Sequence, residues 1–124
     1  MTESTRSASH DDLLALRDAL RRFAVERDWE PYHSPKNLAA ALAVEAAELL
    51  EPFQWLSDEQ SRSLTAGQAA AVREEMADVL LYLIRLADKL NVDLIAAAAE
   101  KMLRNAEKYP VTKAKGSSRK YTEL

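Results

Sequence analysis

The chain contains no cysteine, only two glycines and only four prolines among its 124 residues. The lack of cysteine excludes disulfide bonds, thiolate metal sites and cysteine nucleophiles. Scarce glycine and proline, together with frequent alanine, leucine and glutamate, favour helix over turn-rich β architecture. Because 48% of the residues are hydrophobic, the chain can bury a modest core, and we expect one compact all-α domain.

Long apolar runs and a general excess of positive charge are also missing. Residues 1–12 are polar and unlike a secretory signal, and no apolar run approaches the ~18 residues of a membrane span. We therefore expect a cytoplasmic protein without a membrane partner. Residues 111–124 hold four Lys/Arg and one Glu, a net +3, which leaves −6 on the rest of a chain of net −3. This distribution argues against a nucleic-acid polymer as partner but allows a basic tail near a phosphate.

Four stretches show the apolar spacing of amphipathic helices. The first predicted helix runs from about Asp11 to Arg27, and the second from Pro35 to near Pro52. The third runs from about Gly67 to Leu90. The fourth continues through Asn105 and ends before Pro110. Ser9 with Asp12 resembles a capping box before the first helix, and Ser34 is the expected N-cap of the second. Residues 56–66 are expected to form a linker with room for one short helical turn. The predicted layout is a flexible N-terminus (1–10), a four-helix bundle (11–110) and a basic tail (111–124) that is mobile unless a ligand or neighbour orders it.

Two pairs of carboxylates stand at i, i+3 spacing within apolar helical stripes. Glu45 and Glu48 form the first pair, and Glu75 and Asp78 form the second. Residues three apart on a helix are neighbours on its surface, so each pair can direct two acids to one point. Burying a carboxylate costs several kcal/mol unless a proton, an ion pair or a metal ion compensates its charge. We expect the two acidic helices to pack face to face around one divalent cation site.

The remaining ligand types narrow the choice of metal. A di-iron carboxylate site needs Glu-x-x-His on two helices, and this chain has that spacing once, from Glu30 to His33 in a proline-containing loop. The other histidine, His10, lies in the polar N-terminus. Oxygen ligands alone favour Mg²⁺, with Mn²⁺ as a substitute. The competing interpretation makes the acids surface residues that form ion pairs with nearby cations, namely Lys36, Arg73 or Arg85.

The pattern Glu45-x-x-Glu48 followed by Glu75-x-x-Asp78 resembles the metal-binding signature of the all-α nucleoside triphosphate pyrophosphohydrolases, the MazG-like superfamily. Further segments resemble its dCTP pyrophosphatase branch, namely FAVERDWEPYHSPKNLAAALAVEAAELLEPFQW, REEMADVLLYLIRLA, KMLRNAEKYP and SSRKYTEL. The likeness covers nearly the whole chain from Phe23 onward, apart from the linker. It implies hydrolysis of a nucleoside triphosphate between the α and β phosphates, which yields a monophosphate and pyrophosphate.

The resemblance also implies roles for individual residues. The Mg²⁺ ligands would be Glu45, Glu48, Glu75 and Asp78. Glu48 would orient the attacking water, with Glu51 as an alternative. The nucleoside would be bound by Trp29, Glu30, Tyr32, His33, Trp55 and Tyr82, of which Tyr82 also fits a core stripe. Phosphate contacts would come from Lys101, Asn105 and Lys108, for which a solvated helix face is the alternative, and from the tail segment Arg119-Lys120-Tyr121.

Leu20 departs from the pattern, because the dCTP pyrophosphatase branch carries a histidine at this position, and the linker is also shorter. The sequence predicts a Mg²⁺-dependent hydrolase that cleaves dCTP or a 5-modified dCTP and thereby cleanses the nucleotide pool. The alternatives are the same fold acting on dUTP or a damaged purine triphosphate, and a non-catalytic helical binding module. The resemblance further implies a homotetramer made of two tight dimers.

Overall fold

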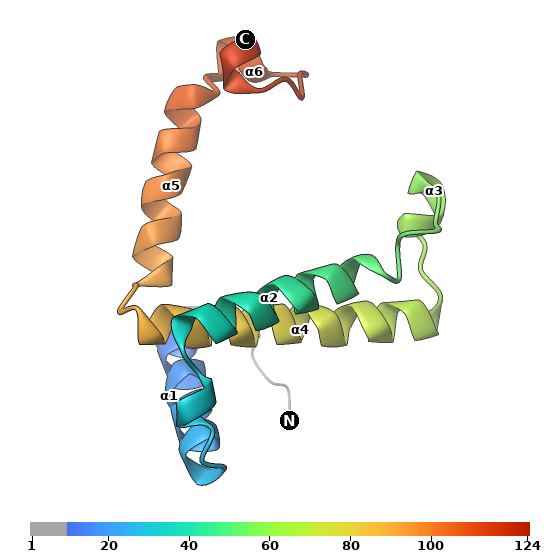
Figure 1. Ribbon diagram of the computed structural model, residues 1–124. Helices are drawn as coiled ribbons and strands as arrows, with labels where there is room; N and C mark the ends of the chain where they lie inside the picture. The colour runs from blue at the N-terminus through green and yellow to red at the C-terminus, as the bar shows by residue number, and fades with distance from the viewer. Residues whose placement is uncertain (1–9) are drawn as a thin grey trace, which may run out of the picture. The chain divides into compact units, whose positions relative to one another are not determined.

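The computed structural model describes residues 10–124, and within that range it contains helices and no strand. The chain divides into two compact units, of which the first ends at Asn91 and the second runs from Val92 to Leu124. The helices are α1 (His10–Glu26), η1 (Glu30–Tyr32), α2 (Pro35–Leu50), α3 (Asp58–Ser61), α4 (Ala66–Lys89), α5 (Leu94–Lys108), α6 (Val111–Ala114) and η2 (Tyr121–Glu123), where η marks a 3-10 helix (Figure 1). The predicted all-α fold class is confirmed.

Polar caps place the long helices close to their predicted positions. The Ser34 hydroxyl accepts a hydrogen bond from the backbone N–H of Asn37 at 3.2 Å and so begins α2. Thr65 begins α4 with a capping box: its hydroxyl accepts from the Gln68 N–H at 3.2 Å, and the Gln68 side chain accepts from the Thr65 N–H at 2.9 Å. Asp93 begins α5 as a simple N-cap, because its carboxylate accepts from the Ala96 N–H at 3.0 Å. Local hydrogen bonds of this kind are readable from sequence, which explains the agreement.

The linker contains one short helical turn, as expected, and the tail contains more structure than its composition indicates. A capping box begins α3, the single helical turn of the linker. In the second unit, the Tyr121 ring packs edge-on against Tyr109 with centroids 6.1 Å apart, and Lys108 Nζ lies 4.9 Å from the Tyr121 ring centroid. These contacts hold the predicted basic tail to the C-terminal end of α5. The predicted N-terminal segment 1–10, with the cap at Ser9, lies outside the described residues apart from His10 at the start of α1.

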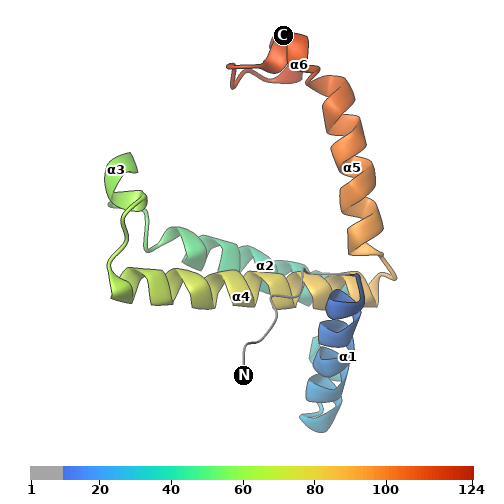
Figure 2. The ribbon, with the colours of Figure 1, turned by 180° about the vertical axis from the view of Figure 1, so that it is seen from behind.

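The first unit is organised around α4. Both views show α2 running beside α4, and α1 packs on α4 near its C-terminal end (Figure 1 and Figure 2). The buried apolar residues come from all three helices: Ala24 of α1, Leu38 of α2, and Val72, Ile84 and Ala87 of α4. Because Leu38 and Val72 lie on the same stripes as the acid pairs, the α2–α4 packing turns those acids toward one another. No helix in the described part of the chain is long and apolar enough to cross a membrane.

The end of α1 determines the position of Trp29. Asp28 adopts a left-handed backbone conformation with φ of 53°, and its N–H donates to the Val25 carbonyl at 3.1 Å. The Trp29 N–H donates to the Ala24 carbonyl at 2.9 Å. These two bonds form a Schellman motif, which reverses the chain directly after the helix. Trp29 is thereby brought back against Phe23, with ring centroids 5.6 Å apart in an edge-on arrangement.

Leu38→Ala should lower the free energy of unfolding by about 2–5 kcal/mol, because Leu38 is 1% exposed and its truncation leaves a cavity. Denaturant unfolding followed by circular dichroism at fixed protein concentration measures this change. Lys36→Ala, at an exposed position of the same helix, is the matched control and should change the free energy of unfolding by less than about 0.5 kcal/mol. Equal losses in the two variants would contradict a core centred on Leu38.

Candidate active site

Three carboxylates from α2 and α4 meet in the first unit. One oxygen of each of Glu45, Glu48 and Glu75 lies within 4.8 Å of the other two. Oε2 of Glu45 and Oε2 of Glu75 are shielded from solvent and have no hydrogen-bond partner among the described residues. Within residues 10–124, neither these three acids nor Asp78 forms a salt bridge with a lysine or arginine. The arrangement therefore differs from a charged helix face neutralised by its neighbours.

The surroundings of Glu45 disfavour its negative charge. Burial is the largest cause, followed by the proximity of the Glu48 and Glu75 carboxyls and the negative charges of Glu48 and Asp78, and together they raise the pKa of Glu45 to about 7. Crowded carboxylate oxygens without a cation are the donor set that a hard divalent ion prefers. The residues present thus fit Mg²⁺ or Mn²⁺, and a bound cation would compensate the two unpartnered oxygens.

Asp78 connects the acid cluster to a pocket. The negative charge of Asp78 helps to raise the pKa of Glu45, but the Asp78 oxygens lie outside the group formed by the three carboxylates. Asp78 also lines a pocket of about 160 Å³ between α1, the segment around η1, and α4. The other lining residues are Leu20, Phe23, Ala24, Trp29, His33, Leu81, Tyr82 and Arg85. A cavity of ~150 Å³ holds one benzene ring, so this pocket has the size for one six-membered ring.

Aromatic and imidazole rings form part of the pocket wall. The Trp29 and His33 ring centroids are 6.1 Å apart, and the rings are inclined at 57°. Tyr82, which fits either a core or a ligand-binding position by its sequence, lines the pocket and is half-buried. Flat rings of this kind stack on nucleobases with little dependence on sequence. Three of the predicted nucleoside-binding residues therefore lie together at one pocket.

The other three predicted nucleoside-binding residues do not line this pocket. The Glu30 carboxylate pairs with Lys89 and Arg85, and their hydrogen bonds, that of Lys89 above all, hold its pKa below the ordinary range. Tyr32 is 69% exposed and Trp55 is 87% exposed. The roles of these residues as nucleoside contacts stay predictions.

The predicted phosphate contacts lie on α5, in the second unit. Lys101, Asn105 and Lys108 are all exposed, at positions i, i+4 and i+7 of this helix. Lys108 already lies over the Tyr121 ring, which is a cation–π contact within the tail. Their role toward phosphate stays a prediction.

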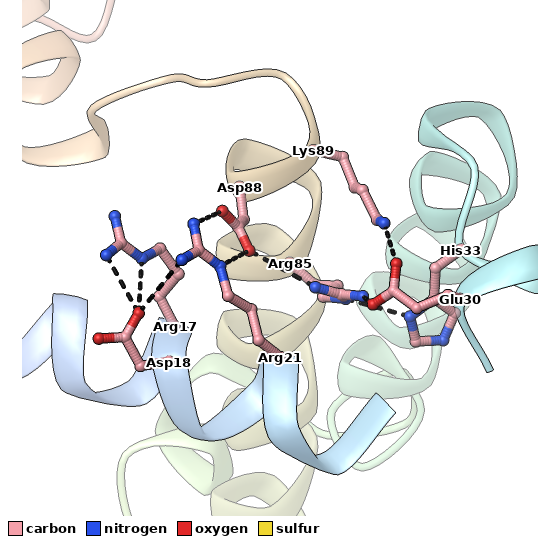
Figure 3. A network of polar contacts seen from close by, with 8 residues as sticks. All are labelled: Arg17, Asp18, Arg21, Glu30, His33, Arg85, Asp88 and Lys89. Atoms are coloured by element: carbon pink, nitrogen blue, oxygen red, sulfur yellow. Dashed lines mark hydrogen bonds and ion pairs between the residues drawn. The ribbon is translucent and has the colours of Figure 1, made fainter. Parts of the chain in front are cut away.

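Sequence reasoning missed Phe23 and Arg85 as pocket residues. Arg85 continues the stripe of Asp78 and Tyr82 at steps of four and three residues, and that spacing is the signal that identifies it. The competing interpretation, in which Arg85 forms an ion pair with one of the clustered acids, is wrong. Arg85 is 5% exposed, pairs with Glu30 and Asp88, and donates from Nε to Nδ1 of His33 at 3.1 Å (Figure 3).

Comparison with known proteins finds similar sequences and a similar solved structure. The chain is similar to dCTP pyrophosphatase 1 of Rattus norvegicus and of Homo sapiens, at 47% and 48% identity over 104 residues. These alignments cover 82% of this chain and 61% of each relative, so the chain spans less than two thirds of their length. The crystal structure of a pyrophosphatase from Archaeoglobus fulgidus DSM 4304 is 40% identical and superposes with a TM-score of 0.74, covering 87% of this chain and 99% of that one. Residues 40–124 match the MazG-like family, and the resemblance seen in the sequence is confirmed. The chain belongs to the MazG-like family.

Proposed function

We propose that this protein is a Mg²⁺-dependent nucleoside triphosphate pyrophosphohydrolase that cleaves dCTP or a 5-modified dCTP to the monophosphate and pyrophosphate. The observation that carries the proposal is the cluster of Glu45, Glu48 and Glu75, which Asp78 joins to a pocket of one-ring size. The relatives named dCTP pyrophosphatase 1 and the archaeal pyrophosphatase support the same reaction class. Its use would be the cleansing of the cytoplasmic nucleotide pool.

The four acids would serve the phosphate end of the substrate. Glu45, Glu48, Glu75 and Asp78 would hold Mg²⁺, for which Mn²⁺ can substitute. When bound, the cation would neutralise the triphosphate and lower the pKa of the attacking water. Glu48 would orient this water and accept its proton as it attacks the α-phosphorus and pyrophosphate leaves. The geometry favours Glu48 over Glu51 in this role, because Glu51 is exposed at the end of α2 and lies outside the cluster.

The pocket would hold the base. Trp29 and Tyr82 offer ring faces for stacking, and His33 offers a hydrogen-bonding edge. The volume of about 160 Å³ suits a pyrimidine better than the two fused rings of a purine. The phosphates would then extend past Asp78 toward the acid cluster, and the cationic groups of Lys101 and Lys108 remain proposed phosphate contacts.

One observation keeps dUTP as a second candidate substrate. Leu20 lines the pocket, and its side chain has no group that could read the hydrogen-bonding edge of a base. Discrimination between cytosine and uracil then falls to the remaining polar lining residues. A purely structural or binding role is less favoured, because a helical assembly module has no need of unpartnered, shielded carboxylate oxygens.

We also propose that the chain acts as a homo-oligomer, a dimer of dimers. The first unit, taken by itself, leaves an apolar stripe of α4 exposed: Met76 is 58%, Leu80 42% and Leu83 37% exposed. The spacing i, i+4, i+7 places these residues on one side of the helix. Contiguous exposed apolar surface is typical of association sites, and a second copy of this chain would cover it.

Pyrophosphate release should depend on Mg²⁺ and be fastest with the cytosine nucleotides. The measurement uses the four common deoxynucleoside triphosphates, dUTP and 5-methyl-dCTP, each with Mg²⁺ and with EDTA. Glu48→Gln should lower kcat by about 10²–10⁴-fold, because a general base contributes that much. Glu59→Gln on α3, outside the cluster and the pocket, is the control and should leave kcat unchanged. Preference for dUTP would replace the proposed substrate, and no Mg²⁺-dependent release from any nucleotide would overturn the enzymatic proposal.

Mg²⁺ binding should weaken as the pH falls below about 7, because the proton on Glu45 must leave before this carboxylate can ligate a cation. Isothermal titration calorimetry should show up to about tenfold weaker affinity per pH unit below that value. Glu45→Gln should bind Mg²⁺ more weakly and without this steep dependence. An affinity independent of pH in the wild type would contradict the proposed ligand set.

The raised pKa of Glu45 also predicts how the stability of the metal-free protein depends on pH. The folded state holds the Glu45 proton more tightly than the unfolded state, so the free energy of unfolding should fall as the pH rises from about 4.5 to about 7. Glu30 and Asp88, whose pKa values are lowered, act in the opposite direction, but only at pH values near and below their ordinary values of 4.5 and 3.8. Thermal denaturation with and without Mg²⁺ checks this, and stabilisation by Mg²⁺ should be larger at pH of about 8 than at about 5.

Sedimentation velocity of the wild type should show an oligomer. Leu80→Asp should shift the distribution to smaller species, because a charge in the apolar stripe opposes burial of that stripe in an interface. Glu74→Gln, a change at an exposed polar position of the same helix, should leave the distribution unchanged. A stable wild-type monomer with full activity would contradict the proposed assembly.

A further inference from the structure

Arg85 is the one charged side chain among the described residues that is buried, and its guanidinium is fixed on three sides. Nε donates to Nδ1 of His33 at 3.1 Å, Nη1 approaches Oδ2 of Asp88 at 3.4 Å, and Nη2 pairs with the Glu30 carboxylate. The partners come from η1, from the segment that follows it, and from α4 itself (Figure 3). A guanidinium held this way has little freedom to turn, so its Nε–H points at His33 persistently.

The two acids that contact Arg85 are each bound by a second cation. Asp88 accepts from Nε of Arg21 on α1 at 2.7 Å, and Glu30 pairs with Lys89 (Figure 3). Asp18 extends the network, because it approaches Arg21 and pairs with Arg17 (Figure 3). Four cations (Arg17, Arg21, Arg85 and Lys89) therefore face three anions (Asp18, Glu30 and Asp88), a net +1 with His33 neutral. The second cations also mean that removal of the Arg85 side chain leaves neither carboxylate unpaired.

The bond from Arg85 determines which nitrogen of His33 carries the proton. An arginine Nε–H can only donate, so Nδ1 of His33 must accept and cannot hold a hydrogen. In a neutral imidazole the proton then sits on Nε2, which becomes a hydrogen-bond donor. Burial first, and then the positive charge of Arg85, keep the pKa of His33 below its usual range, so the ring is neutral at pH 7.

We propose that Arg85 is a positioning residue that acts through His33, holding the imidazole in its Nε2–H form so that the pocket presents a hydrogen-bond donor to the base. This inference rests on the proposed function of the pocket as the site of a pyrimidine. The base atom opposite His33 must then be an acceptor, which cytosine offers at both O2 and N3. Uracil offers acceptors at O2 and O4 but has a donor at N3. An Nε2–H donor of His33 placed opposite N3 therefore recognises cytosine over uracil, which Leu20 cannot do.

The tautomer can be observed directly in the full-length wild-type protein with Mg²⁺ present. The chain has two histidines, and His10→Gln assigns their signals in ¹⁵N-histidine-labelled protein. At pH of about 8, His33 should show an unprotonated Nδ1 and a protonated Nε2. A proton on Nδ1 of His33 overturns the proposal. This readout requires no turnover, so its failure is distinguishable from failure of the proposed reaction, which the pyrophosphate assay tests on the wild type.

Arg85→Met should convert His33 to a mixture of tautomers and raise KM for dCTP by about two- to fivefold, with a smaller change in kcat, because only the Nε2–H fraction of the rings then donates to the base. Arg85→Lys keeps a donor without the fixed direction and should give an intermediate KM. Arg21→Gln is the matched control: it removes a cation from the same network but leaves the Nε–Nδ1 bond, and should leave KM unchanged.

A merely structural role for Arg85 predicts a different pattern. Partial unfolding would lower the active fraction, and with it kcat, while KM and the His33 tautomer of the folded fraction stay those of the wild type. That pattern in Arg85→Met, or an equal rise of KM in Arg21→Gln, overturns the positioning role.

Discussion

The packing of α2 against α4 forces carboxylates together, and the rest of the site depends on this constraint. Leu38 and Val72 are buried on the same stripes as Glu45 and Glu75, so the apolar contact that stabilises the helix pair also fixes the direction of the acids. Like charges within 4.8 Å oppose the packing that brings them together. The fold meets this cost by retaining a proton on Glu45 near neutral pH, or by binding a cation in its place.

The acid cluster and the pocket that adjoins it compensate buried charge in opposite ways. Near Glu45 none of the clustered acids forms a salt bridge with a lysine or arginine of residues 10–124, which leaves the site ready for an ion from solution. Near Arg85 every charge has a partner within the protein, and the guanidinium contacts two carboxylates and an imidazole. A buried network of this kind adds little net stability, but its directed hydrogen bonds hold the guanidinium, the carboxylates and the imidazole in one geometry. Rigid structure therefore lies at the proposed base end, and unsatisfied charge at the proposed phosphate end.

Local features account for what the sequence predicts correctly. The start of α2 follows from the cap at Ser34, whose hydrogen bond joins residues three apart. The meeting of Glu45 with Glu75 is predictable because both sit on apolar stripes that must face a core. These inferences need only spacing along one helix and the cost of burying charge.

Contacts between distant residues account for what the sequence does not predict. Arg85 bonds Glu30 and His33, which are 55 and 52 positions away, and no helical period indicates which of several acids it meets. The composition of the tail predicts a mobile segment, but the ring of Tyr121 packs on Tyr109. Conversely, Trp55 has the residue type of a base-binding wall but is 87% exposed, because the chain beyond α2 carries it out of the pocket.

A single helix connects the two ends of the proposed substrate. Glu75, Asp78, Tyr82 and Arg85 lie along one stripe of α4, and a rise of 1.5 Å per residue separates Glu75 from Tyr82 by about 10 Å along the axis. Because an α-helix is stiff over this length, the distance from the base pocket to the acid cluster is set by the backbone. Base recognition and placement of the α-phosphate are then not independent. A base that enters the pocket less deeply would displace its phosphates along α4 by the same distance. A wrong base would therefore be rejected at the reacting end, because its α-phosphate would be misplaced. Loss of one hydrogen bond to a base at the correct depth would weaken binding alone.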